Sequence, residues 1–204
     1  SFTVAMQELG GQVVEVNSSF RKNEEPEDTA RVLAGYCHAI MSRTHEQRIL
    51  ERMAAVSPVP VINGLSDTHH PCQVLADILT LQQHHKDLSK IKVTYVGDGN
   101  NILHSLLLLL PYLGGHLAYA CPRGFEPNAF IVKRAMQRAE ESGGSIFVAE
   151  DPIEAAKNSD ALYTDVWTSM GFESSEMDRE KIFADFQTCT CRYAGRRRCV
   201  DYIL

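Results

Sequence analysis

A strand gives way to a helix within Asn63-Gly-Leu-Ser-Asp-Thr-His-His-Pro-Cys-Gln-Val-Leu-Ala-Asp-Ile-Leu-Thr-Leu81. The apolar residues 58–62 before it are typical of a short buried strand, and the polar residues 63–69 are typical of a loop. Pro71 suits the first turn of a helix, where its missing N–H needs no partner. We expect the helix to pack on the face formed by its apolar residues at helical spacing, Val74, Leu75, Ile78, Leu79 and Leu81.

Two polar side chains, His70 and Gln73, stand at the start of that helix. A helix N-terminus has unpaired N–H groups and partial positive charge, which favour an anionic ligand. A His-Pro dipeptide in this place is more often only a capped turn. The pair by itself therefore leaves both a structural and a ligand-binding role open.

The composition is that of an ordinary globular protein of 204 residues, 44% hydrophobic and 23% charged. This length gives room for one domain or two small ones. The apolar runs stay below the roughly 18 residues that a membrane-spanning helix needs, and Pro111 closes the densest of them, 106–110. We therefore expect a soluble protein with no membrane partner.

The net charge of −6 argues against a nucleic-acid surface. Only the last residues, 188–204, are basic, with four Arg and one Asp. The run 196–198 within them could contact phosphate groups, although a short basic run is more often a solvated tail. We therefore expect no nucleic-acid partner.

Cysteine and histidine usage argues against a metal site. Cys189, Cys191 and Cys199 cluster, but they form no Cys-x-x-Cys pair and no histidine follows position 116. The remaining cysteines stand alone, as reduced thiols of an intracellular protein do: Cys37, Cys72 and Cys121. We expect no metal.

Helices and strands are expected to alternate along the chain, which indicates an α/β fold with parallel strands and helices on both faces. The expected strands are 12–16, 38–42, 58–62, 92–96, 116–121, 145–149 and 161–166. The expected helices are 2–9, 26–33, 46–55, 102–113, 128–141, 152–158 and the one that begins at Pro71.

Ligands of such sheets bind at the carboxyl ends of the strands. Arg43 and Thr44 follow one expected strand, and Asp165 stands at the end of another. On this evidence alone Arg43 could equally be a surface residue, and Asp165 could equally cap a loop or a helix.

The turn 97–101 joins a strand to a helix, as in a dinucleotide-binding unit. Ile102 takes the place of the third glycine of Gly-x-Gly-x-x-Gly, so the fingerprint is incomplete. A nicotinamide-dependent dehydrogenase is therefore a distant alternative.

Three motifs resemble the aspartate/ornithine carbamoyltransferase family, and within it the ornithine carbamoyltransferases. They are Asn-Gly-Leu-Ser-Asp followed by His-His-Pro-Cys-Gln-Val-Leu-Ala-Asp (63–77), Tyr-Val-Gly-Asp-Gly-Asn-Asn-Ile-Leu-His-Ser (95–105) and Asp-x-Trp-x-Ser-Met-Gly (165–171). The last motif separates ornithine from aspartate carbamoyltransferases.

The resemblance implies two sets of site residues. His70 and Gln73 would polarise the carbonyl of carbamoyl phosphate, and Asp165 would pair with the α-ammonium of ornithine. The set for carbamoyl phosphate is Arg43, Thr44, His70 and Gln73, of which Arg43, His70 and Gln73 are the expected catalytic residues. The set for ornithine is Asn101, Asp165, Ser169 and Met170.

The resemblance also implies two Rossmann-like parallel-sheet halves joined by a helix, both incomplete. Residues 1–83 would form the carbamoyl-phosphate half and residues 84–187 the ornithine half. The family's Ser-Thr-Arg-Thr and His-Cys-Leu-Pro motifs are absent from the sequence. We therefore expect a chain truncated at both ends, with a tail, 188–204, that resembles nothing in the family and could be disordered.

The implied activity is transfer of the carbamoyl group of carbamoyl phosphate to the δ-amine of L-ornithine, giving citrulline and phosphate. This step belongs to arginine biosynthesis and the urea cycle, needs no cofactor, and implies a homotrimer in the cytoplasm or the mitochondrial matrix. The missing motifs leave a second hypothesis open. It is a non-catalytic fragment or relative that binds an amino acid or a partner chain.

Overall fold

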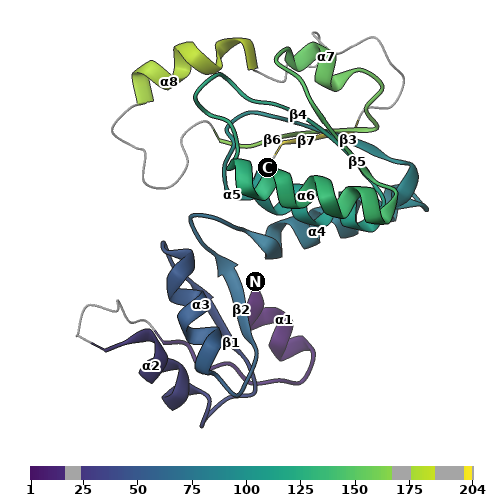
Figure 1. Cartoon of the computed structure of the whole chain (residues 1–204). Coiled ribbons are helices and arrows are strands. Elements are labelled where there is room, and N and C mark those ends of the chain that lie inside the picture. Colours follow the sequence, from purple (N-terminus) through teal and green to yellow (C-terminus); the bar gives the residue numbers. More distant parts are fainter. Residues whose placement is uncertain (17–23, 167–175, 187–199, 204) are drawn as a thin grey trace.

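The computed structural model describes residues 1–16, 24–166, 176–186 and 200–203, which Figure 1 shows as two lobes. The first lobe contains helices α1 (Phe2–Glu8), α2 (Pro26–Leu33) and α3 (Gln47–Val56) and strands β1 (Ile40–Arg43) and β2 (Val61–Leu65). Helix α4 (Pro71–His84) leads from β2 into the second lobe and packs against its sheet. The predicted α/β fold of parallel sheets is therefore confirmed.

The first lobe is built on two parallel strands, β1 and β2. A register shift between Ser42 and Arg43 places Arg43 opposite Leu65, so Arg43 ends β1 close to the end of β2. The lobe has a small core, whose buried cluster comes from α2, β1 and α3 and consists of Ala30, Ile40 and Met53.

The second lobe is a five-stranded parallel sheet in the order β5-β4-β3-β6-β7. Its strands are β3 (Lys92–Val96), β4 (His116–Ala120), β5 (Ser145–Val148), β6 (Ala161–Thr164) and β7 (Val200–Ile203). The direction of strand succession reverses between β3 and β6. Ligands of open α/β sheets bind at this switch point, outside the carboxyl ends of the two strands.

Helices cover both faces of this sheet (Figure 1). Helices α4, α5 (Asn101–Leu109) and α6 (Ala129–Ser142) enclose the main core on one face. On the other face, α7 (Pro152–Ala156) and the 3-10 turn η4 (Ala184–Phe186), which follows α8 (Glu176–Phe183), pack on a smaller cluster of alanines. Two further 3-10 turns are η1 (Leu88–Lys90) and η2 (Pro111–Leu113).

Two expected strands of the first lobe are corrected. Residues 12–16 form no strand, because they find no neighbouring strand in the described chain, and Val14 is 77% exposed. Strand β2 starts at Val61 and continues to Leu65, so three residues of the expected loop are in the sheet. Pro58 and Pro60 lack the N–H that a strand ladder needs, which delays the start of pairing.

The expected packing face of α4 is too wide. Val74, Ile78 and Leu81 are buried, as predicted, but Leu75 and Leu79 are 55% and 56% exposed. Only one side of α4 faces the sheet of the second lobe, so the apolar residues next to that side remain at the surface.

Of the tail 188–204, the structure describes residues 200–203. Val200–Ile203 forms strand β7, which pairs in parallel with β6. The sequence Val-Asp-Tyr-Ile is rich in residue types that favour strands, and the outer edge of β6 offers unpaired backbone groups. Residues 188–199 lie outside the described part of the chain.

A buried histidine on α5, His104, joins the strand-to-helix junction to α6. Its Nε2 accepts a hydrogen bond from the Asn128 N–H at 3.0 Å, so the neutral ring carries its proton on Nδ1, which donates to the Thr68 carbonyl at 2.9 Å. Burial lowers the pKa of His104, and the bond to Thr68 and the nearby Asp98 charge oppose this effect. The junction is therefore held by a histidine in its neutral form.

We expect the free energy of unfolding to fall as the pH drops below about 6.5, the ordinary pKa of histidine. Below this pH, His104 binds a proton in the unfolded chain more readily than in the folded chain. Each histidine with a lowered folded pKa changes the free energy of unfolding by up to about 1.4 kcal/mol per pH unit. Urea titrations from about pH 7 to 5 should show a weaker pH dependence for His104→Gln than for the parent. The exposed His38→Gln serves as control, and a His104→Gln curve parallel to the parent would contradict this account.

Candidate active site

The described site residues stand where strands end and helices begin. Arg43 is the last residue of β1 and is followed by Thr44, whose N–H donates to the Leu65 carbonyl at 3.0 Å. His70 immediately precedes α4, Gln73 lies in its first turn, Asn101 begins α5 and Asp165 follows β6. Ser169 and Met170 lie outside the described residues.

The loop between β2 and α4 is pinned to the start of α5. The Asn101 side-chain amide donates to the Ser66 carbonyl at 2.7 Å, and the His70 N–H donates to the Ser105 hydroxyl oxygen at 2.8 Å. Ser105 in turn donates to the Asn101 carbonyl at 2.8 Å. The structure thus brings together two predicted site residues from different motifs, His70 and Asn101.

Ser66 organises the interior of that loop and is fully buried. Its N–H donates to the His69 carbonyl at 2.8 Å, and its hydroxyl oxygen accepts from the His69 N–H at 3.0 Å. The same hydroxyl donates to the Gln47 side-chain carbonyl on α3 at 2.7 Å. Neither Ser66 nor Ser105 was predicted as a site residue. A serine in a loop before a helix, like Ser66, is a common signal of such turns, whereas Ser105 lies inside α5.

The His70 ring is neutral and has an unused polar atom. Burial is the main cause that lowers the pKa of His70, the Arg43 charge lowers it further, and Asp165 raises it. Its Nδ1 is buried and has no hydrogen-bond partner among the described residues. A buried polar atom without a partner costs about 1–3 kcal/mol, so a ligand atom that bonded Nδ1 would remove an existing penalty.

Asn100, the neighbour of the candidate ornithine residue Asn101, contacts Asp165. The Asn100 side-chain amide donates to the Asp165 carboxylate at 2.7 Å, and the Val166 N–H donates to the other oxygen of that carboxylate at 2.7 Å. The amide oxygen of Asn100 also caps α5, accepting from the Ile102 N–H at 3.0 Å. An asparagine directly before a helix is a cap signal that could have identified this residue.

The turn before α5 has no room for a side chain at Gly99. A Cβ there would lie 2.3 Å from the Pro127 nitrogen, so only glycine fits. The next turn residue back, Asp98, is buried and forms an ion pair with Arg179 of α8 at 3.0 Å. Close packing and a buried ion pair therefore hold the turn that presents Asn100 and Asn101.

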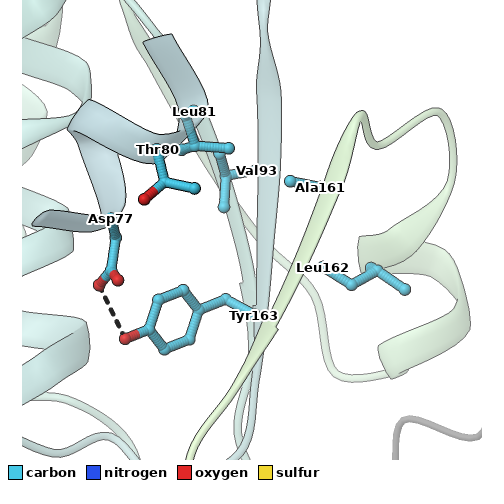
Figure 2. Close-up of a pocket in the computed structure, with 7 residues that line it drawn as sticks. All are labelled: Asp77, Thr80, Leu81, Val93, Ala161, Leu162 and Tyr163. Carbon is cyan, nitrogen blue, oxygen red and sulfur yellow. Dashed lines mark hydrogen bonds between the residues drawn. The ribbon is translucent and has the colours of Figure 1, made fainter. Parts of the chain in front are cut away.

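Gln73 is linked to β6 through Asp77, which the sequence analysis did not select. The Gln73 side-chain amide donates to one oxygen of the Asp77 carboxylate at 3.0 Å, and the Tyr163 hydroxyl donates to the other at 2.9 Å. Figure 2 shows this second bond beside a cavity of about 10 Å³, roughly one water molecule, between α4 and the sheet. The cavity is mostly apolar and is not the space between His70 and Asp165.

The described residues contain neither a metal-binding cluster nor a membrane-spanning helix. Among them, no group of three or more His, Cys, Asp or Glu side chains is arranged to hold a metal ion. No helix in the described part of the chain is long and apolar enough to cross a membrane.

The two halves of the chain match the two domains of one protein family. Residues 1–83 match the aspartate/ornithine carbamoyltransferase carbamoyl-P binding domain, and residues 89–190 match the Asp/Orn binding domain of the same family. The anabolic ornithine carbamoyltransferase of Pyrococcus furiosus is 47% identical over 190 residues, which are 92% of this chain and 60% of that protein. The ornithine carbamoyltransferase of Anoxybacillus flavithermus is 46% identical over the same shares.

Solved structures agree with the sequence relatives. The ornithine carbamoyltransferase of Pyrococcus furiosus superposes with a TM-score of 0.90 at 44% identity, covering 96% of this chain and 64% of that one. The anabolic enzyme of Campylobacter jejuni gives a TM-score of 0.90 at 30% identity, covering 100% and 69%. The chain spans about 60% of the length of the curated relatives it matches, and it belongs to the aspartate/ornithine carbamoyltransferase family.

Proposed function

We propose that these residues form part of an ornithine carbamoyltransferase, which moves the carbamoyl group of carbamoyl phosphate to the δ-amine of L-ornithine. The observation that carries the proposal is the position of His70. Its pKa responds both to Arg43 from the first lobe and to Asp165 from the second. A cation suited to phosphate and an anion suited to an amino acid therefore both act electrostatically on one neutral imidazole.

Arg43, Thr44, His70 and Gln73 would bind carbamoyl phosphate. When the amine attacks the carbonyl carbon, negative charge develops on the carbonyl oxygen and must be met by fixed donors. Arg43 can supply a charged donor and neutral His70 a ring N–H. One N–H of Gln73 is committed to Asp77, and its other N–H and its amide oxygen remain for the carbamoyl group.

Asp165 would bind the α-ammonium of ornithine. Its carboxylate is held by Asn100 and by the Val166 N–H, so it faces the switch point in a fixed orientation. Asn101 donates an N–H to Ser66, and its amide oxygen remains as an acceptor for the substrate. Ser169 and Met170 complete this set on sequence grounds, and together the groups would place the neutral δ-amine near the carbonyl carbon.

The wider biological role follows the same relatives. Two of these relatives are named anabolic ornithine carbamoyltransferases, which supports a role for this chain in arginine biosynthesis. The same reaction also serves the urea cycle, and its product is citrulline. A homotrimer is proposed from the family resemblance. The prokaryotic sources of the relatives support a cytoplasmic location, with the mitochondrial matrix as the alternative.

A second candidate function rests on one observation. The 204 residues contain neither Ser-Thr-Arg-Thr nor His-Cys-Leu-Pro and span about 60% of their relatives. A non-catalytic role in binding an amino acid or a partner chain is consistent with that. Isothermal titration with ornithine, carbamoyl phosphate and a nicotinamide cofactor, together with a citrulline assay, separates the two functions and also tests the dehydrogenase alternative.

We expect Asp165→Asn to weaken ornithine binding without unfolding the chain, because it removes a charge opposite the ammonium but keeps the shape. Hydrogen bonds to charged groups contribute roughly 1.5–3 kcal/mol, so the dissociation constant should rise about tenfold or more. Isothermal titration measures this change. Asp28→Asn, on exposed Asp28 of α2, is the control, and equal ornithine affinity in Asp165→Asn and the parent would exclude the assigned ornithine site.

We expect the 204-residue polypeptide alone to form citrulline very slowly. Three charge-assisted hydrogen bonds of roughly 1.5–3 kcal/mol each would equal most of a millimolar to micromolar affinity, which is about 4–8 kcal/mol. A chain without the Ser-Thr-Arg-Thr motif therefore should hold carbamoyl phosphate too briefly to react. Turnover near ~10 per second would show instead that other residues replace that motif.

A further inference from the structure

Asp77 lies one turn after Gln73 on α4 and contacts both Gln73 and strand β6. One carboxylate oxygen accepts from the Gln73 amide at 3.0 Å, and the other accepts from the Tyr163 hydroxyl at 2.9 Å. Figure 2 shows the Tyr163 ring reaching from β6 toward the carboxylate. Asp77 is thus the connection between a proposed carbamoyl-phosphate residue and the strand that leads to Asp165.

An ionised carboxylate can only accept hydrogen bonds. The NH₂ group of the Gln73 amide must therefore face Asp77, and the amide oxygen must point the other way. Without such a partner the terminal torsion of a glutamine is broad and roughly two-fold, so either end could face a ligand. Asp77 decides which end of Gln73 is presented to the site.

The second contact extends to the ornithine half. Tyr163 stacks on Tyr95, with ring centroids 5.7 Å apart and planes 28° from parallel. The Tyr95 hydroxyl donates to the Asp98 carbonyl at 2.8 Å and lies 3.3 Å from the Asn100 side-chain oxygen, and Asn100 holds Asp165. A continuous series of contacts therefore runs from Gln73 through Asp77 to Asp165.

The charged state of Asp77 depends on these contacts. Burial raises the pKa of Asp77, the hydrogen bonds from Gln73 and Tyr163 lower it, and the Asp165 charge raises it. Burial and the Asp77 carboxylate also raise the pKa of Tyr163, so that hydroxyl remains a donor. In the described part of the chain, the groups that act on Asp77 are Gln73 on its own helix, Tyr163 on β6 and, through its charge alone, Asp165.

We propose that Asp77 is a positioning residue for carbamoyl transfer: it fixes the orientation of the Gln73 amide and links it through Tyr163 to the Asp165 side of the site. This inference rests on the proposed function. It goes further because it assigns a role to a residue that would not itself contact the substrate. It also means that a side chain of β6 in the second lobe, Tyr163, helps to fix the orientation of the Gln73 amide through Asp77.

The test uses the NMR signals of the Gln73 side-chain amide in the intact chain, assigned by their loss in Gln73→Leu. In the parent, the bonded amide proton should be shifted downfield and should titrate with the Asp77 carboxyl group. Asp77→Asn should abolish both the shift and the titration. Asp87→Asn makes the same chemical change in a carboxylate that caps η1 and should leave the Gln73 signals unchanged.

Tyr163→Phe provides a second variant that removes one oxygen and keeps the ring. Because the Tyr163 hydroxyl lowers the pKa of Asp77, its loss should move the midpoint of the Gln73 titration to higher pH. This variant decides the question if Asp77→Asn does not fold. Gln73 signals that are the same in parent, Asp77→Asn and Tyr163→Phe would overturn the proposal.

Kinetics separate the inference from the proposed function. Where citrulline formation is measurable, Asp77→Asn should lower kcat/KM for carbamoyl phosphate about tenfold or more, and Asp87→Asn should not change it. A chain that binds no ornithine in isothermal titration but shows the expected NMR changes would reject the proposed function and keep the positioning of Gln73. Unchanged kcat/KM in Asp77→Asn would reject the role of Asp77 in the reaction.

Discussion

The site depends on the hydrogen bonds that dock the loop 66–70 onto the first turns of α5. Ser66 and Thr68 offer carbonyl oxygens and His70 its N–H, and side chains of α5 meet all three. Each bond has a modest net value, about 0.5–1.5 kcal/mol, but leaving these groups buried without partners would cost more. The docking therefore specifies one position of the loop, and with it the position of the helix N-terminus that carries His70 and Gln73.

Neutral histidines are a consequence of that docking. Burial lowers the pKa of His69, His70 and His104, which gather where the loop meets α5. In His104 both ring nitrogens are used within the protein, so this residue is structural. His70 differs because its Nδ1 is buried and has no partner within the described parts of the chain, so the same physical environment leaves this atom available to a ligand.

The predictions from sequence were correct for elements that neighbouring residues determine. They were wrong where a distant part of the chain determines whether a strand forms. Pro71 at a helix start and the turn before α5 were predicted from neighbouring residues and are confirmed. The expected strand 12–16 fails because a strand needs a neighbour, and β7 forms because β6 supplies one. The contact of Asn100 with Asp165 joins residues 65 positions apart, so no local pattern predicts this contact, although the cap position of Asn100 is a local signal.

The domain boundary suggested by the sequence does not coincide with the way the candidate residues are divided between the two lobes. His70 and Gln73 fall within the family's carbamoyl-P binding domain, 1–83, yet α4 packs into the main core of the second lobe with Val74, Ile78 and Leu81. Asn101 and Asp165 belong to that same lobe. Among the candidate residues that the structure describes, only Arg43 and Thr44 are carried by the first lobe, whose buried core cluster is small. The distance from Arg43 to the other candidate residues is therefore set by how β2 and the docked loop connect the lobes, and the remaining residues keep their mutual geometry through one shared core.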